Sequence, residues 1–505
     1  MAETKTVQTS DGQVITYVDE IIGSGGMKDV YFSTDKKKAV AFFRDPVDKV
    51  GLERLEMITN SYKKGIFENE YGEYWKKLFC WPESVIYDGK RHGVVLPAYD
   101  KHYFFEHGSI NNDFLGIKGR EKEGKWFAAP TNRLTRLDPR ERGDWRMYLR
   151  LCLMIARATR RMHAAGLAHS DLSYKNVLIS PSSGHACIID VDGLVVPGKY
   201  PPDVVGTPDF IAPEVIATTH LDKDDPARVL PSRYTDRHAL AVLIYQYLLL
   251  RHPLRGRKIH DMNDPANDET LSMGEKALFI EHPTDKSNRT DPSAARESDQ
   301  FWLDTDKLPY TVTGPYLSEL FKKAFIDGLH NPNKRPTADE WESAIIKTID
   351  LVQPCDNEDC TGKWYAFDNS KKPSCPFCDT AYKGELPVIN LYSDRGGKGK
   401  FMPDNHRLMI YKDQSIFPWH IDRNIIPNER LKDKDSGRVG YCIFHNKQWL
   451  LVNEKLNEMF DYTDKNNVKQ IKKGQFIALV DGVKILVKNG RSSSRLLLVQ
   501  MVKGQ

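Results

Sequence analysis

The residues best suited to chemistry in this chain lie between positions 169 and 190. Asp171 is followed five residues later by Asn176, and Asp190 comes directly after a short apolar run. Phosphoryl transfer needs a carboxylate that orients and deprotonates the attacking hydroxyl. It also needs an amide and a second carboxylate that hold magnesium ions on the nucleotide phosphates. Asp171 is therefore the candidate catalytic base, and Asn176 and Asp190 are the candidate Mg²⁺ (or Mn²⁺) ligands.

Three further motifs follow the first group in a fixed order. Residues 206–214 end in the triplet Ala-Pro-Glu, Asp236 opens an apolar run, and Arg335 precedes an amphipathic stretch over residues 338–349. One short motif carries little weight, but four in this order are not expected by chance. The set resembles the protein kinases. That resemblance implies a bilobal fold in which Arg335 forms an ion pair with Glu214 of the triplet.

A glycine-rich turn near the N-terminus is a candidate nucleotide-binding loop. Gly23, Gly25, Gly26, Lys28 and Val30 resemble the glycine loop of kinases, with Lys28 at the place of the third glycine. Glycines let backbone N–H groups approach phosphates closely. Because the catalytic loop lies downstream, these five residues are expected to bind ATP. Alone, the turn would indicate only an ordinary hairpin.

The next predicted strand departs from the kinase pattern. Kinases place a phosphate-binding lysine at the end of this strand, whereas residues 40–43 end in Phe43. Arg44 points to the opposite face of the strand from Phe43 and from Ala41, a further expected ATP-binding residue. Either the pocket has lost its cation, as in a pseudokinase, or Lys28 supplies the charge from the neighbouring strand. The second arrangement is similar to the With-No-Lysine kinases, and the paired loss and gain of lysine favour it.

A carboxylate on a helix is expected to pair with the relocated lysine. Residues 51–62 form the predicted helix, and Glu53 and Glu56 are the candidates. The sequence does not choose between them.

The stretch after the catalytic loop is not a standard D-F-G motif, because it reads Asp-Val-Asp-Gly over residues 190–193. Asp190 is the preferred metal ligand, since it follows the usual apolar lead-in. Asp192 either adds charge near a second metal or is a turn residue. Thr207 corresponds to the residue of serine/threonine kinases that hydrogen-bonds the base, which favours protein hydroxyls as substrates.

Four cysteines lie in two pairs separated by fourteen residues. Cys355 and Cys360 form the first pair, and Cys375 and Cys378 form the second. Thiolates at this spacing suit a tetrahedral Zn²⁺ held by two knuckles, a zinc ribbon, rather than disulfides. Because four cysteine ligands leave no open coordination position, the Zn²⁺ is expected to be structural.

The C-terminal part changes character. Residues 386–505 alternate short β-branched and aromatic runs with turns, which predicts an all-β module, a sandwich or a barrel. The runs over 449–453 and 474–479 resemble forkhead-associated domains, which read phosphothreonine. Arg423 and Arg438 are the candidates for the arginine that such a domain requires.

The predicted fold class is α+β, with a bilobal kinase fold, a zinc ribbon and an all-β C-terminal sandwich. The expected boundaries are 14–350 for the kinase domain (small lobe 14–99, large lobe 100–350), 351–385 for the ribbon and 386–505 for the β-module. This combination, with the runs over 165–173 and 192–198, resembles bacterial kinases of the tellurium-resistance phosphorylation triad. The resemblance covers essentially the whole chain. It implies a von Willebrand factor A protein and a PP2C-type phosphatase as partners.

The composition sets outer limits on function. In 505 residues, 73 lysines and arginines nearly balance 69 aspartates and glutamates, so the net charge of +4 gives no reason to expect nucleic acid or a membrane surface as partner. Residues 1–13 lack the apolar core of a signal peptide, and residues 239–250 are too short to span a bilayer. The chain is expected to be cytoplasmic.

Three hypotheses follow. The first is an ATP- and Mg²⁺-dependent serine/threonine protein kinase in which Lys28 replaces the strand lysine. The second is a pseudokinase scaffold that docks partners through the ribbon and the β-module. The third is a kinase that acts on a small molecule.

Overall fold

The computed structural model describes residues 3–24, 27–196, 199–200, 206–222, 224–367, 372–395, 399–488 and 494–504. The chain divides into two compact units. The first comprises Met1–Gly143, Met147–Tyr310 and Glu319–Glu342, and the second comprises Asp144–Arg146, Thr311–Ser318 and Ser343–Gln505.

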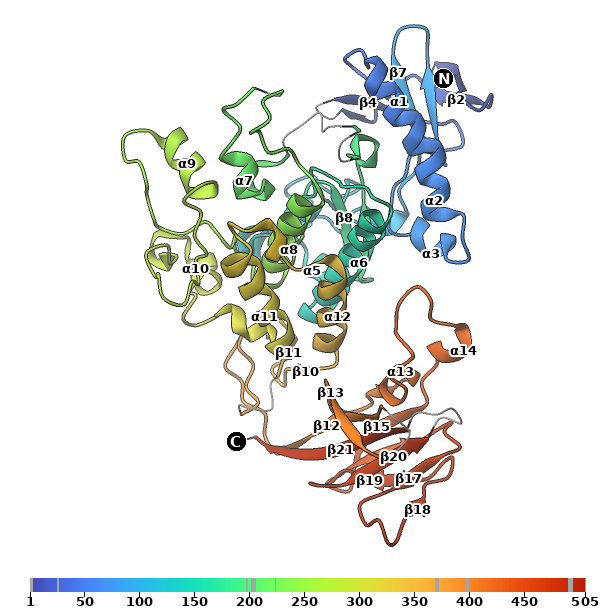
Figure 1. Ribbon diagram of the computed structural model, residues 1–505, viewed down its shortest axis with the longest axis vertical. Helices are drawn as coiled ribbons and strands as arrows, with labels where there is room; N and C mark the ends of the chain where they lie inside the picture. The colour runs from blue at the N-terminus through green and yellow to red at the C-terminus, as the bar shows by residue number, and fades with distance from the viewer. Residues whose placement is uncertain are drawn as a thin grey trace. The chain divides into compact units, whose positions relative to one another are not determined.

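The N-terminal part of the first unit is an antiparallel sheet, drawn in blue in Figure 1. Among the described residues its strand order is β2-β1-β6-β7-β5-β4-β3. The strands are β1 (Thr4–Thr9), β2 (Val14–Val18), β3 (Gly23–Ser24), β4 (Lys28–Phe32), β5 (Lys38–Phe43), β6 (Ser84–Tyr87) and β7 (His92–Pro97). The sheet thus begins at Thr4, before the predicted start of the small lobe at residue 14, because β1 pairs with both β2 and β6.

Strand alternation gives this sheet two apolar faces. On β5, Val40 and Phe42 pack with the aromatic side chains of Tyr17 and Tyr31, whereas Ala41 packs on the other face with a cluster that includes Leu55 of helix α1. Successive side chains of a strand point to opposite faces, so both arrangements follow from the run of apolar residues in β5.

Helix α1 (Lys49–Met57) begins at Asp48, whose side chain accepts a hydrogen bond from the backbone N–H of Gly51. A π-helical turn over Ile58–Tyr62 and the helices α2 (Lys63–Phe67) and α3 (Gly72–Lys76) follow it. The predicted helix over residues 51–62 is therefore present, and it continues beyond that range.

The rest of the first unit is mainly helical and includes one short hairpin, β8 (Val177–Ser180) and β9 (His185–Ile188). The segment after residue 145 forms the long helix α6 (Trp145–Ala164). The apolar run after Asp236 belongs to α8 (Arg233–Leu249), which is buried almost throughout. The remaining helices of the central part of the chain are α4 (Ile110–Asp113), α5 (Pro139–Arg142), α7 (Pro213–Ile216), α9 (Pro265–Met273), α10 (Glu297–Leu303), α11 (Pro315–Lys322) and α12 (Ala338–Ile349).

The C-terminal part of the second unit is rich in β-structure, drawn in orange and red in Figure 1. A hairpin, β10 (Val352–Pro354) and β11 (Trp364–Ala366), precedes two sheets whose described strands have the orders β13-β12-β21-β20-β17-β18 and β14-β15-β16-β19. Their bounds are β12 (Glu385–Asp394), β13 (Phe401–Met409), β14 (Ser415–Ile416), β15 (Gly440–His445), β16 (Gln448–Asn453), β17 (Met459–Asp461), β18 (Lys469–Gln470), β19 (Phe476–Ala478), β20 (Lys484–Lys488) and β21 (Ser494–Lys503). Two short helices, α13 (Pro418–Ile421) and α14 (Asp433–Ser436), lie between β14 and β15 along the chain.

The two C-terminal sheets enclose a common apolar interior. A small cavity is lined by Ile416 and Leu451 from one sheet and by Val487 and Leu497 from the other. The alternating burial along β21 agrees with one face turned to this interior and one turned away.

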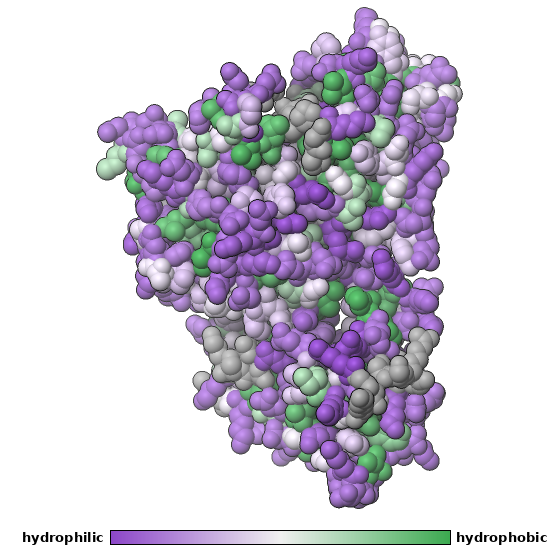
Figure 2. Space-filling view, in the orientation of Figure 1, coloured by the Kyte–Doolittle hydropathy of each residue, from purple (hydrophilic) through white to green (hydrophobic). Residues whose placement is uncertain are grey.

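The face of the molecule drawn in Figure 2 is mostly hydrophilic, with hydrophobic residues scattered over it singly or in small groups. Such scattered residues are normal at protein surfaces. Within the described ranges, none of the helices combines the length and the apolar character needed to cross a lipid bilayer.

Candidate active site

A cavity of about 510 Å³ lies where the small-lobe sheet meets the segments around β8 and β9. The cavity brings together predicted site residues that are far apart in the sequence: Gly23, Lys28, Val30, Ala41, Asn176 and Asp190 all line it. Leu96 to Tyr99, the end of β7 and the two residues after it, also line the cavity. The predicted ATP-binding residues Gly25 and Gly26 lie outside the described residues.

Lys28 enters this cavity from β4. Its cross-strand partner on β5 is Phe43, the residue at the expected lysine position. Directly opposed residues of an antiparallel pair project from the same face of the sheet. The Nζ of Lys28 consequently lies 5.7 Å from the centroid of the Phe43 ring.

Two aspartates hold the ammonium group of Lys28. Its Nζ lies 2.7 Å from Oδ1 of Asp190 and 2.8 Å from both carboxylate oxygens of Asp192. Burial by itself lowers the pKa of Lys28, but the charges of Asp192 and Asp190 outweigh burial and raise the pKa above its ordinary value. Lys28 is therefore a cation at neutral pH.

Arg44 does not reach the cavity. Its side chain is 40% exposed, and its guanidinium donates to Oδ1 of Asp29 at 2.9 Å. This is the orientation that strand alternation predicts for Arg44.

The expected ion pair between Lys28 and a helix glutamate is not formed among the described residues. Glu53 instead accepts a hydrogen bond from the hydroxyl of Tyr200 at 2.7 Å, and Glu56 is exposed. The reason is the rotation of α1, whose buried face carries Arg54 and Leu55 rather than either glutamate. The prediction that Glu53 or Glu56 pairs with Lys28 is corrected accordingly, since Asp190 and Asp192 take that place.

Asp171, the candidate base, is held in one orientation by two neighbours. Its Oδ1 accepts hydrogen bonds from Thr207, from the backbone N–H at 2.6 Å and from Oγ1 at 2.8 Å. The side-chain amide of Asn176 donates to the backbone oxygen of Asp171 at 2.8 Å and to its Oδ2 at 2.9 Å. The hydrogen bond expected between Thr207 and the base is thus present.

A buried aspartate that the sequence did not single out as a site residue anchors the catalytic loop. Asp236, at the start of α8, accepts hydrogen bonds from the backbone N–H groups of His169 at 2.7 Å and Ser170 at 3.1 Å. It also contacts Nε2 of His163 at 3.0 Å. A buried carboxylate needs such partners. The acidic residue that opens an otherwise apolar helix was the available sign of this role.

The aspartates of the Asp-Val-Asp-Gly stretch differ in environment. Asp190 has left-handed backbone angles (φ 60°, ψ 40°), uncommon for a residue with a side chain. Its side chain is 49% exposed, whereas that of Asp192 is 5% exposed. The ring Nε2 of His169 lies 3.0 Å from the backbone oxygen of Ile189, which ties the catalytic loop to this stretch. Asp190 is therefore the aspartate with carboxylate surface open to the cavity.

The four predicted zinc ligands come together in the second unit. The sulfur atoms of Cys355, Cys360, Cys375 and Cys378 all lie within 4.8 Å of one another. The Sγ–Sγ distances are 3.5 Å for Cys355 and Cys378 and 3.6 Å for Cys360 and Cys375. Tetrahedral Zn–S bonds of about 2.3 Å place neighbouring sulfurs about 3.8 Å apart. The cluster is therefore compatible with Zn²⁺.

Residues 139–344 match the protein kinase domain family. The chain therefore contains a protein kinase domain, and Asp171, Asn176, Asp190 and Thr207 fall inside the matched range. Lys28 and the small-lobe sheet lie before that range.

Curated relatives are protein kinases. The chain is 28% identical to the serine/threonine-protein kinase PknD of Chlamydia felis over 313 residues, which cover 54% of this chain and 28% of the relative. It is 32% identical to PknD of Chlamydia pneumoniae over 272 residues (47% and 24%). It is also 32% identical to protein kinase C-like 2 of Schizosaccharomyces pombe over 119 residues (23% and 10%). The chain spans less than a third of the length of these relatives. These matches agree with the presence of a protein kinase domain in this chain.

Proposed function

We propose that this chain is an active serine/threonine protein kinase in which Lys28 replaces the missing strand lysine. The observation that carries the proposal is the pairing of Lys28 directly opposite Phe43. Because paired residues share one face of the sheet, an ammonium group at position 28 reaches the space that a lysine at position 43 would fill. This arrangement is similar to that of the With-No-Lysine kinases.

Of the remaining parts of the transfer site, Asn176 and Asp190 line the same cavity, and Asp171 lines a second cavity of about 300 Å³ that also contains Lys28 and Asp190. Asp171 accepts the proton of the attacking hydroxyl, and Thr207 fixes the orientation of its carboxylate. Asn176 and the open carboxylate of Asp190 are oxygen donors suited to Mg²⁺, which neutralises the charge of the nucleotide phosphates. ATP occupies the 510 Å³ cavity, and Val30 and Ala41 face its adenine ring.

Transfer from radiolabelled ATP by the purified full chain tests this proposal. Lys28→Met and Asp171→Ala are expected to abolish autophosphorylation. Arg44→Met is the matched control, because it removes a neighbouring cation that faces away from the cavity, and it is expected to retain activity. Loss of activity in Arg44→Met together with full activity in Lys28→Met would refute the relocation of the lysine.

The alternative is a pseudokinase scaffold. If Mg-ATP binds, but wild type and Asp171→Ala give the same background transfer, the scaffold explains the data and the kinase proposal fails. Strong transfer to a metabolite with none to protein would instead favour a small-molecule kinase.

We further propose that the cysteine cluster holds a structural Zn²⁺ in a zinc ribbon. The antiparallel hairpin of β10 and β11 adjoins the first cysteine pair, as expected for a knuckle supported by short strands. With all four positions taken by thiolates, the metal has no place for a substrate, and its role is to stabilise this segment.

For the C-terminal β-module we propose a forkhead-associated-like fold that binds an anionic partner. A cavity of about 470 Å³ in the second unit is lined by the cationic side chains of Lys347, Arg395, Arg423 and Arg495. Arg438, the other candidate, instead pairs with Glu454 at 2.7 Å. By resemblance to the tellurium-resistance triad, the partners are a von Willebrand factor A protein and a PP2C-type phosphatase. Co-purification with each protein tests these partners, and Arg423→Ala tests the cavity.

A further inference from the structure

We propose that Asp192 is the positioning residue of Lys28, the task that the sequence assigned to a glutamate on helix α1. This inference rests on the proposed role of Lys28 in binding ATP. Asp192 belongs to the single turn Val191–Gly193, directly after the candidate metal ligand.

Asp192 is committed to Lys28 more fully than Asp190 is. Both oxygens of Asp192 lie 2.8 Å from the Nζ of Lys28, whereas Asp190 contacts the same atom through Oδ1 alone. The side chain of Asp192 is also the more deeply buried of the two. A buried carboxylate has to be compensated by a cation or by hydrogen bonds. The two aspartates therefore divide their tasks, Asp192 holding the lysine and Asp190 remaining available to a metal.

Helix α1 turns neither of its glutamates to the site, and the carboxylate of its N-cap residue Asp48, which lines the neighbouring cavity, accepts the backbone N–H of Gly51 at 2.7 Å. A second cavity, of about 300 Å³, lies beside Lys28 and Asp192 and is lined on the helix side by Gly51, Arg54 and Leu55. The position that would carry an acidic partner thus carries a buried arginine. Glu53 is held by Tyr200 on the other side of the helix.

Compared with the expected pair of a strand lysine and a helix glutamate, both members of the ion pair lie on different elements in this chain. The lysine has shifted from β5 to β4, and its carboxylate from the helix to the metal-binding turn. A lysine at position 28 and an aspartate at position 192 can then meet whatever the rotation of α1, because neither residue belongs to the helix. The lysine is consequently placed by the same turn that carries the metal ligand Asp190.

A double-mutant cycle on Mg-ATP affinity tests this role. The dissociation constant is measured by calorimetry for the full chain, Asp192→Asn, Lys28→Met and the double variant. If Asp192 acts through Lys28, Asp192→Asn raises the dissociation constant of Mg-ATP in the wild-type background but not in the Lys28→Met background. The fold-change caused by Asp192→Asn is expected to differ between the two backgrounds by about tenfold or more. The same fold-change in both backgrounds would mean that Asp192 acts on the nucleotide independently, and would overturn the inference.

Kinetics give a second readout. Asp192→Asn is expected to lower kcat/KM for ATP by about 10- to 100-fold, the loss typical of a charge-assisted hydrogen bond, and Asp192→Glu is expected to restore part of it. The Mg²⁺ concentration for half-maximal rate should stay unchanged in Asp192→Asn and rise in Asp190→Asn. A raised Mg²⁺ requirement in Asp192→Asn would make Asp192 a metal ligand instead.

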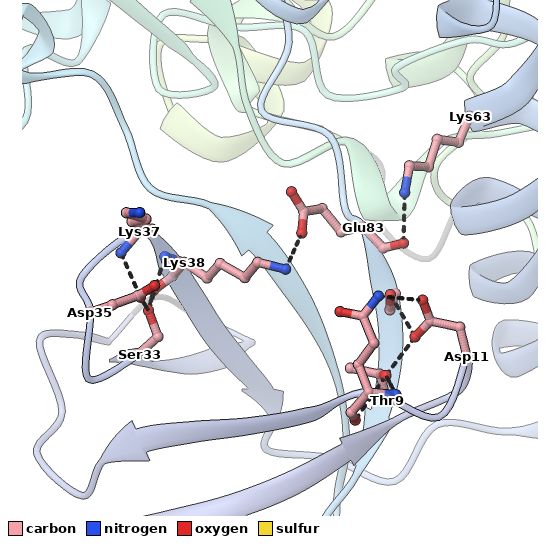
Figure 3. Close-up of polar contacts among 10 residues, drawn as sticks. Thr9, Asp11, Ser33, Asp35, Lys37, Lys38, Lys63 and Glu83 are labelled. Carbon is pink, nitrogen blue, oxygen red and sulfur yellow. Dashed lines mark hydrogen bonds and ion pairs between the residues drawn. The ribbon is translucent and has the colours of Figure 1, made fainter.

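Glu83→Gln is the matched control. Glu83 pairs with Lys38 at 2.9 Å in the same lobe (Figure 3). Neither residue lines the two cavities beside Lys28, so the substitution should show no coupling to Lys28. Glu53→Gln tests the helix glutamate as the partner of Lys28 instead. Coupling between Glu53 and Lys28, with none between Asp192 and Lys28, would also overturn the inference. If the wild type binds ATP but transfers no phosphate, the kinase proposal fails, while the binding cycle still decides the role of Asp192.

Discussion

Asp171 and Thr207 are joined by two hydrogen bonds to a single carboxylate oxygen. Oδ1 of Asp171 accepts both the backbone N–H and the hydroxyl of Thr207, at 2.6 and 2.8 Å. Because Oδ2 is contacted by the amide of Asn176, the carboxylate has little freedom to rotate. In the proposed role of Asp171 as the base, such fixation places the proton acceptor before the substrate arrives, which is how positioning contributes to rate.

Thr207→Val removes the hydroxyl and keeps the backbone donor and the side-chain shape. The variant is expected to lower kcat about tenfold with little change in the KM for ATP, because one of the two bonds that orient the base is lost. Steady-state kinetics with a protein or peptide substrate check this. Thr207→Ser retains the hydroxyl and should stay near wild type, and equal kcat values for the valine and serine variants would contradict the role of the hydroxyl.

The ion pair between Glu214 and Arg335 should carry part of the stability of the large lobe. The guanidinium donates to both carboxylate oxygens, at 2.7 and 2.6 Å, and Arg335 is buried. Removing one partner of a buried pair leaves an uncompensated charge, so Glu214→Ala is expected to cost about 3 kcal/mol. Thermal unfolding measures the loss. Glu73→Gln breaks an exposed pair with Lys76 and should change stability by less than about 1 kcal/mol.

Much of the architecture could be predicted from local pattern. Helix α12 spans the amphipathic stretch expected over residues 338–349, because its apolar residues recur on one face over several turns. The sequence pattern does not indicate strand β1, since four of its six residues are exposed and only pairing with its neighbours defines it. Lys28 is a candidate from the sequence because its gain and the lysine lost at position 43 fall at fixed places in one motif.

The partners of the site residues were harder to predict. Glu53 and Glu56 are equally plausible partners of Lys28 from the sequence, because the sequence does not fix how α1 is rotated against the sheet. Arg54 occupies the buried face that one of them was expected to fill. The sequence does not decide whether Asp192 adds charge near a metal or is a turn residue, because only the folded chain brings residues 28 and 192 together.

Metal content distinguishes the zinc cluster from ordinary free thiols. The purified chain is expected to contain stoichiometric zinc by atomic absorption, and Cys375→Ser is expected to lose it, because three thiolates bind far less tightly than four. Cys442→Ala removes a buried cysteine outside the cluster and should keep the metal. Equal zinc content in the two variants would contradict the assignment.

The carboxylate of Asp350 is expected to make the unfolding free energy of the second unit depend on pH in the acid range. It contacts Nε2 of His406 at 2.6 Å and Nε2 of His420 at 3.3 Å. Burial by itself raises the pKa of Asp350, but the charge of His420 and the hydrogen bond from His406 hold it well below its usual range.

A carboxyl group with a lowered pKa in the folded state stabilises the fold above its unfolded pKa, and this contribution is lost as the pH falls. Asp350→Asn should therefore cost about 1–3 kcal/mol of unfolding free energy near pH 5. The gap to wild type should narrow below about pH 4, where the unfolded carboxyl becomes protonated. Denaturant unfolding at several pH values measures the gap, and a gap that widens on acidification would show that Asp350 is not the group responsible.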